Sequence, residues 1–423
     1  MKEFDGYKYI DGGVCASKGF KASGVYAGIK QSEIADGNES PISNTKNDIA
    51  LLVSDVMCNA AAVYTQNKVK GAPIVVTKRN LETTGGKAQA VIVNSKNANT
   101  CNADGEEKAE KMCQLAANAL NLKPEEVIVA STGVIGQVLP IEPIEKAIPK
   151  LILGLCVCGN EDAATAIMTT DTVKKEVAVE FEIDGKVCHL GGMAKGSGMI
   201  HPNMATTLNF ITTDCAVSRD MLQKALSEVV KITYNCLSVD GDQSTNDMVA
   251  LMSNGLSENI EITEPNADFE IFKQALYIVM MNMTRMLAKD GEGATKLLEC
   301  TVSGANDLDN AIIVAKSVIN SPLVKCAMYG ADANCGRIMC AMGYAETNCC
   351  VTDADVYYIS NAGKILVCEK GIGLQFDEEL AKNILSEDEI TIYVDLHQGN
   401  AKATAWGCDL TYDYVKINGD YRS

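Results

Sequence analysis

Histidine is scarce in this sequence, which contains 3 His among 423 residues. His189, His201 and His397 lie far apart along the chain. Catalysis by Ser-His or Cys-His pairs, like most metal-dependent hydrolysis, requires histidines. If the chain is an enzyme, we therefore expect a general base other than histidine.

Long apolar runs and a basic surface are also missing. No run approaches the roughly 20 residues that span a bilayer, and the first residues lack the apolar core of a signal sequence. The chain carries 37 Lys+Arg against 55 Asp+Glu, a formal net charge of -18. This balance disfavours nucleic acid as a partner. With 47% hydrophobic residues, we expect a globular, cytoplasmic protein without a membrane partner.

Cysteine is abundant, but its pattern fits neither a disulfide framework nor a zinc site. An odd number, 17, in a long chain without a signal sequence argues against extracellular disulfides. The closest pairs, Cys156-Val-Cys158 and Cys349-Cys350, lack the Cys-x-x-Cys spacing of zinc ligands. We expect reduced thiols, most of them buried as small apolar residues.

Strand-like and helix-like patterns alternate, which indicates a mixed α/β protein, and no linker rich in Pro, Gly or Ser divides it. The expected strands are residues 48–56, 74–77, 90–94, 127–130 and 323–328. The expected helices are residues 105–120, 219–234, 269–287 and 308–319.

Two hairpins are expected. Residues 179–183 alternate between apolar and polar, Asp184-Gly185 suits a tight turn, and residues 186–190 return. A second hairpin is expected from residues 390–396 through a turn into residues 401–406. The last hundred residues would then form a strand-rich subdomain.

A glycine-rich stretch follows the first hairpin and precedes an apolar, β-branched run that starts at Thr206. A surface loop that merely connects two elements explains most such stretches. The spacing matches neither the Gly-x-Gly-x-x-Gly nor the Walker phosphate motif. A flexible loop that leads into a buried strand is the expected structure.

Thr206, at the start of that strand, has a chemical use if the Ala205-Thr206 bond is cut. It would then carry both a hydroxyl nucleophile and an α-amine. Such an amine has a pKa of about 7.7 to 8.0, so it can accept the hydroxyl proton without a histidine. Threonine paired with its own amine is a known form of activated nucleophile.

Residues 195–206, Lys-Gly-Ser-Gly-Met-Ile-His-Pro-Asn-Met-Ala-Thr, resemble the self-cleavage segment of the ornithine acetyltransferase family. Six further stretches resemble motifs of that family in the same order, and the likeness runs from about residue 10 to the C-terminus. They are residues 94–99, 131–136, 168–172, 240–247, 320–325 and 330–334.

The resemblance implies a precursor that cuts itself between Ala205 and Thr206. The products would be an α chain of residues 1–205 and a β chain of residues 206–423, held in one interlocked unit. Residues from about 300 to 423 would be the C-terminal subdomain. The implied fold is the self-processed N-terminal-nucleophile type, with layered β-sheets between helices, assembled from two α and two β chains. No metal is required.

The implied reaction belongs to arginine biosynthesis. Thr206 takes the acetyl group of N2-acetylornithine, ornithine leaves, and L-glutamate collects the acetyl group as N-acetylglutamate, with ping-pong kinetics. The Thr132-Gly133 pair would form the oxyanion hole. Family members divide between this transfer alone and an additional step that uses acetyl-CoA, and no residue here decides between the two.

The resemblance also implies substrate contacts. They are Thr172, Lys195, Thr206, Glu292, Asn418 and Ser423. A lysine suits an amino acid carboxylate and a glutamate suits an amine. By residue type alone, Lys195 would be a solvated loop lysine and Glu292 part of an ordinary turn. Asn418 and Ser423 would be a frayed tail. Their roles therefore depend on the resemblance.

Some positions depart from the family pattern. Lys96 stands where glycine is usual, and the chain ends in Ser423 where threonine is common. Serine keeps the hydroxyl. Other functions stay open. One is a related N-terminal-nucleophile aminopeptidase, which releases the acyl group to water. The others are non-catalytic, an amino acid-binding descendant or a thiol-rich metal store.

Overall fold

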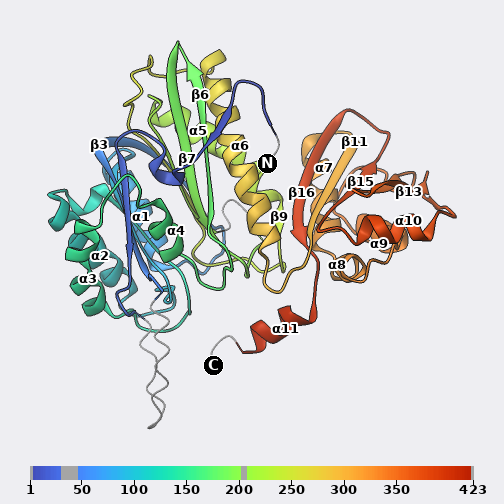
Figure 1. The fold of residues 1–423 in the computed structure, drawn as a ribbon, viewed down its shortest axis with the longest axis horizontal. Helices are drawn as coiled ribbons and strands as arrows, with labels where there is room; N and C mark the ends of the chain where they lie inside the picture. The colour runs from blue at the N-terminus through green and yellow to red at the C-terminus, as the bar shows by residue number, and fades with distance from the viewer. Residues whose placement is uncertain (1–2, 30–45, 202–206, 421–423) are drawn as a thin grey trace, which may run out of the picture.

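The computed structural model describes residues 3–29, 46–201 and 207–420. Figure 1 shows two β-sheets side by side, with helix α6 (Ala267–Lys289) between them. The mixed α/β class with layered sheets, expected from the sequence, is confirmed.

The first sheet has nine strands within the described residues. Eight of them lie in the order β1 (Lys8–Ile10), β6 (Lys175–Ile183), β7 (Lys186–Lys195), β8 (Leu208–Thr213), β10 (Met248–Ser253), β3 (Ile49–Tyr64), β4 (Lys87–Asn94) and β5 (Val127–Ser131), and β2 (Phe20–Val25) pairs with β3. Neighbours are antiparallel except β8 with β10 and β4 with β5. Two strands that follow residue 205, β8 and β10, therefore lie between strands that precede it in the same sheet.

The second sheet has seven strands in the part of the chain that the structure describes. Their order is β14 (Ile372–Gly373), β13 (Gly363–Glu369), β12 (Asp355–Ser360), β15 (Glu389–Asp395), β11 (Leu297–Ala305), β16 (Ala401–Cys408) and β9 (Leu237–Ser238). All of these strands follow residue 206.

Helices join the two sheets through one continuous apolar core. The long helix α6 packs on β6 and β7 and also reaches β11 and β16, while α5 (Arg219–Ile232) packs against α6. Behind the second sheet, α7 (Leu308–Asn320) covers β11 and β16. The remaining helices are α1 (Ala72–Thr83), α2 (Gly105–Leu120), α3 (Ile141–Leu153), α4 (Asn160–Ala166), α8 (Pro322–Tyr329), α9 (Cys335–Gly343), α10 (Glu378–Leu385) and α11 (Tyr412–Gly419).

Most expected elements are confirmed. The first hairpin is the β6–β7 pair, and its turn residues Asp184 and Gly185 have φ values of 52° and 68°. Positive φ at both positions is what a tight hairpin turn requires. Helix α2 spans the expected residues, and the cysteines are free thiols, ten of them buried.

Two expected strands are wrong. Residues 74–77 form the first turns of α1 after Pro73, and residues 323–328 belong to α8. In α8, Ser321 Oγ accepts a hydrogen bond from the N–H of Val324, and Pro322 follows the cap. A short apolar run cannot distinguish a buried strand from a helix, and the proline at the start of each segment favours the helix.

The second expected hairpin is also wrong. Strands β15 and β16 do not pair, because β11 lies between them, parallel to β15 and antiparallel to β16. The connection crosses the end of β11, where the N–H of Leu396 donates to Ser303 O and that of Gln398 to Gly304 O. A strand more than 80 residues earlier in the chain thus takes the place that the local pattern gave to the partner.

Among the described helices, none is alone long and apolar enough to cross a membrane. One pair, α7 with α8, meets the length and composition test together but is bent by 58°.

Candidate functional site

A cavity of about 270 Å³ opens at one end of the nine-stranded sheet, where β7 ends and β8 and β10 begin. Its described wall comes from eight segments of the chain. They are Ala98, residues 132–135, Thr169 and Thr170, a stretch with Lys195, Gly196, Gly198 and Met199, Thr207 and Leu208, residues 244–247, Glu292, and Asn418. The cavity thus gathers parts of five of the stretches that carry the family resemblance.

The Thr132-Gly133 turn after β5 forms one side of the cavity. Thr132 is buried, and its N–H donates to Asn94 O at 3.0 Å. Gly133 has φ of 133°, and a Cβ there would lie 2.2 Å from the carbonyl carbon of Lys96. Lys96 itself has φ of 76°, which accounts for the glycine usual at that position. Backbone packing therefore holds this turn in place.

Lys195, the last residue of β7, supplies the positive charge of the cavity wall. Its Nζ lies 3.3 Å from Thr169 Oγ1. Burial of the ammonium lowers the pKa of Lys195, although Asp171, Asp247 and Glu292 act in the opposite direction. A cation in such a setting can bind a carboxylate.

Glu292 faces the cavity from the turn after α6. It is buried, and its Oε2 accepts a hydrogen bond of 2.8 Å from Asn418 Nδ2. Gly198 packs directly on this carboxylate, because a Cβ there would lie 2.3 Å from Oε2. Helix α11 leaves the end of β16 and runs back toward the first sheet, which brings Asn418 to the site (Figure 1).

Thr172 lies outside this cavity. Its side chain is exposed and hydrogen-bonded to Asp290, in a neighbouring depression also lined by Lys416. The structure therefore brings together Thr132, Gly133, Lys195, Glu292 and Asn418 but leaves Thr172 beside them. Three predicted positions, Ala205, Thr206 and Ser423, lie outside the described residues.

A buried ionic cluster that the sequence did not reveal lies behind the cavity. Lys175, fully buried at the start of β6, places Nζ 2.7 Å from Asp171 Oδ1 and 2.5 Å from Asp290 Oδ2. Asp171 Oδ1 also accepts the N–H of Gly196 at 2.6 Å. Burial opposes ionisation of Asp171, but Lys175, Lys195 and these hydrogen bonds hold the pKa of its carboxyl below the ordinary value. The cluster ties the end of β7 to the end of α6.

Asp247 is the second group that sequence reasoning missed. It ends the motif of residues 240–247, but no role was attached to it. The side chain is 4% exposed and lines the cavity. Burial raises the pKa of this carboxyl well above its ordinary value, against the attraction of Lys195.

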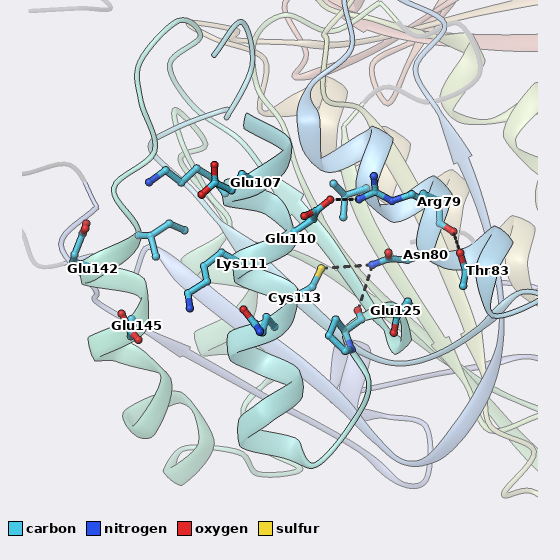
Figure 2. A pocket seen from close by; sticks show the side chains of 15 residues that line it. Arg79, Asn80, Thr83, Glu107, Glu110, Lys111, Cys113, Glu125, Glu142 and Glu145 are labelled. Atoms are coloured by element: carbon cyan, nitrogen blue, oxygen red, sulfur yellow. Dashed lines mark hydrogen bonds and ion pairs between the residues drawn. The ribbon is translucent and has the colours of Figure 1, made fainter. Parts of the chain in front are cut away.

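A larger cavity, about 810 Å³, lies among α1, α2 and α3 (Figure 2). Its wall is mostly charged, and Arg79 pairs there with Glu110 at 2.6 Å. It contains none of the residues that the sequence singled out. The smaller cavity at the end of the sheet is therefore the candidate site.

No histidine lines the described wall of the candidate site. His189 pairs with Asp214, His201 with Ser238, and His397 with Asp355. No group of three or more His, Cys, Asp or Glu residues suited to a metal occurs within residues 3–29, 46–201 and 207–420.

Comparisons with a family model and with curated proteins both point to the ArgJ family. The model of the ArgJ family matches residues 25–423. The chain is 50% identical to arginine biosynthesis bifunctional protein ArgJ 1 of Clostridium acetobutylicum, over 96% of each chain. It is 48% identical to the bifunctional protein ArgJ of Caldanaerobacter subterraneus, over 98% of this chain and 99% of that one. A crystal structure of the Bacillus halodurans argJ protein is 44% identical, with a TM-score of 0.47, over 49% of this chain and 96% of that chain.

Proposed function

From the premise that this chain belongs to the ArgJ family and is an acetyltransferase of arginine biosynthesis, we propose that its cavity transfers an acetyl group from N2-acetylornithine to L-glutamate. The acetyl group is carried as an ester of Thr206. The observation that supports this most directly is the grouping of Thr132, Gly133, Lys195 and Glu292 around Thr207, the residue that follows the nucleophile.

Thr206 becomes the nucleophile after the Ala205-Thr206 bond is cut. Its hydroxyl proton passes to its own α-amine, which has a pKa of about 7.7 to 8.0 in peptides, and Oγ attacks the acetyl carbon. The Thr132 hydroxyl and the Gly133 N–H stabilise the oxyanion that forms. The scarcity of histidine supports this mechanism, because it needs none.

The charged groups of the cavity suit an acylated diamino acid. Lys195 binds the α-carboxylate and Glu292 binds the side-chain ammonium, with the Asn418 amide beside it. When glutamate is the acceptor, Lys195 binds its α-carboxylate in the same way. Thr172 and Ser423 are the remaining proposed contacts.

The working enzyme would be two chains, residues 1–205 and 206–423, assembled as two copies of each in the cytoplasm, with the C-terminal subdomain from about residue 300. The insertion of β8 and β10 of one chain between β7 and β3 of the other supports their staying together. The free thiols suit a reducing compartment. The transfer needs no metal or cofactor. An assay with acetyl-CoA and glutamate tests whether acetyl-CoA also serves as a co-substrate.

Incubation with N2-acetylornithine and glutamate tests the proposal. Formation of N-acetylglutamate and ornithine is expected, with ping-pong kinetics. Acetate alone would instead indicate a hydrolase of the aminopeptidase kind, and no reaction would favour an amino acid-binding protein. Mass spectrometry of the denatured protein should show two fragments that meet at residues 205 and 206, whereas Thr206→Ala should stay at full length and be inactive.

A further inference from the structure

Three ionisable side chains lie on the described wall of the cavity, and the proposed function uses only two of them. Lys195 and Glu292 are assigned to the substrate, and each has a polar neighbour, Thr169 and Asn418 respectively. Asp247, the third, has no assigned role. Asp247 directly precedes β10, and hydrogen bonds hold its backbone in place: Asp247 O accepts the N–H of Thr65, and the N–H of Met248 donates to Thr207 O.

The carboxyl group of Asp247 is unusual in being buried without its full set of partners. Its Oδ2 has no hydrogen-bond partner among the described residues. Leaving a buried polar atom unpaired costs about 1–3 kcal/mol, and a buried charge costs more. A carboxyl kept in this state at a cavity wall, with Lys195 as the nearby cation and Glu292 as the other acid, suits a group that exchanges a proton or hydrogen bond with a ligand.

We propose that Asp247 is a further catalytic residue, the group that gives a proton to the departing ornithine amine and takes one from the arriving glutamate amine. This rests on the proposed function. The direction of the pKa shift agrees with it, because burial raises the pKa of the carboxyl and so favours the protonated form of Asp247.

The protons balance over the cycle. In the first half, the Thr206 Oγ–acetyl bond forms and the acetyl–nitrogen bond breaks. The hydroxyl proton reaches the departing nitrogen through the α-amine of Thr206, and Asp247 supplies a second proton, so ornithine leaves as an ammonium ion. In the second half, the glutamate ammonium gives one proton to the Asp247 carboxylate and its nitrogen attacks the ester. A second proton returns through the α-amine to Thr206 Oγ, and the third stays in the new amide.

The test compares substrates that need this proton with substrates that do not. An amine donor and glutamate need it, whereas p-nitrophenyl acetate releases an anion and hydroxylamine is uncharged at neutral pH. Asp247→Asn should slow transfer from acetylornithine to glutamate by about 100-fold or more, yet change transfer from p-nitrophenyl acetate to hydroxylamine by less than about threefold. Asp247→Glu should recover part of the lost rate.

Tyr358→Phe is the matched control. Tyr358 in β12 is also buried with an unpartnered oxygen, but it lies outside the cavity wall, so both reactions should keep their rates. An equal loss in both reactions of Asp247→Asn, or no loss in either, would overturn the proposal. A wild-type protein that makes no N-acetylglutamate would instead overturn the proposed function.

A second measurement covers the case in which Asp247→Asn does not cut itself. Infrared difference spectra of Thr206→Ala and of Thr206→Ala/Asp247→Asn, both uncut, are compared at neutral pH. The stretch of a protonated carboxyl group should be present in the first and missing from the second. Identical spectra would show that Asp247 holds no proton and would overturn the proposal.

Discussion

At the scale of single residues, the site depends on positions that require a particular backbone conformation or a particular charge. The motif of residues 131–136 pointed to Thr132-Gly133, but the sequence could not show why glycine is needed. The structure supplies two reasons, a positive φ and the close approach of the Lys96 carbonyl. Lys96 is a comparable case, because it takes a positive φ that glycine adopts more easily.

Gly133→Ala should therefore reduce both activity and stability. The added Cβ would meet backbone at 2.2 Å, so the turn must shift away from the developing oxyanion. We expect kcat to fall by about 100-fold or more and stability to fall by about 1–3 kcal/mol, measured by steady-state kinetics and urea unfolding.

Gly136→Ala is the control for strain alone. Gly136 also has a positive φ, 79°, but a Cβ there meets nothing within 4 Å. Its cost should be about 1–2 kcal/mol with activity retained. Equal losses of activity in the two variants would contradict a specific role for the packing at Gly133.

His201 should make stability depend on pH. Burial, with a smaller effect of Lys316, lowers the pKa of His201 to about 4, below the unfolded value of about 6.5. A pKa that is lower in the folded state means that folding favours the neutral imidazole. The contribution of His201 to the free energy of unfolding is therefore complete above about pH 6.5 and is lost as the pH falls toward 4. Between pH 7.5 and pH 5, wild type should lose about 1–2 kcal/mol more than His201→Asn. Urea unfolding of both proteins at both pH values measures this. An equal loss of unfolding free energy in wild type and in His201→Asn would contradict it.

At the scale of elements, sequence patterns worked where the signal was local. The β6–β7 hairpin has its turn residues in the sequence, and α2 has a full helical period. Residues 74–77 and the β15–β16 connection failed, because a short apolar run lacks a period and β11 is distant in sequence. The buried cluster around Lys175 belongs to the same class of long-range feature, since Asp290 lies 115 residues away.

Lys175→Met should destabilise the protein by about 3–5 kcal/mol, because it leaves Asp171 and Asp290 buried without their cation. Lys174→Met is the adjacent control. Lys174 pairs with Glu161 and Glu176 at the surface, and such pairs contribute less than about 1 kcal/mol. Urea denaturation of both variants measures the difference. Similar losses of unfolding free energy would show that the buried cluster contributes no more to stability than the surface ion pairs.

At the scale of the whole molecule, the proposed cleavage would divide a structure whose parts are interleaved. Strands β8 and β10 of the second chain lie between β7 and β3 of the first. The largest apolar core includes residues of both chains, among them Val179 and Phe272. Separation of the chains would expose this core and break the hydrogen bonds of two strand pairs.

The two chains should therefore remain together after cleavage. We expect them to elute as one species in native size-exclusion chromatography and to separate only in denaturant. Thr206→Ala, uncut, should elute at the same volume as the cut wild type. Separate elution of the two fragments under native conditions would contradict the interleaved sheet.

The sequence alone was sufficient for the α/β class, the β6–β7 hairpin, the family resemblance and the expectation of a base other than histidine, because these depend on local patterns and residue types. Only the tertiary structure decided that Thr132, Gly133, Lys195, Glu292 and Asn418 share one cavity while Thr172 lies beside it. Within the described residues, it alone also revealed the Lys175 cluster and the unpartnered Oδ2 of Asp247. Burial and pairing of a charged side chain depend on which distant segments cover it, and no local pattern encodes that.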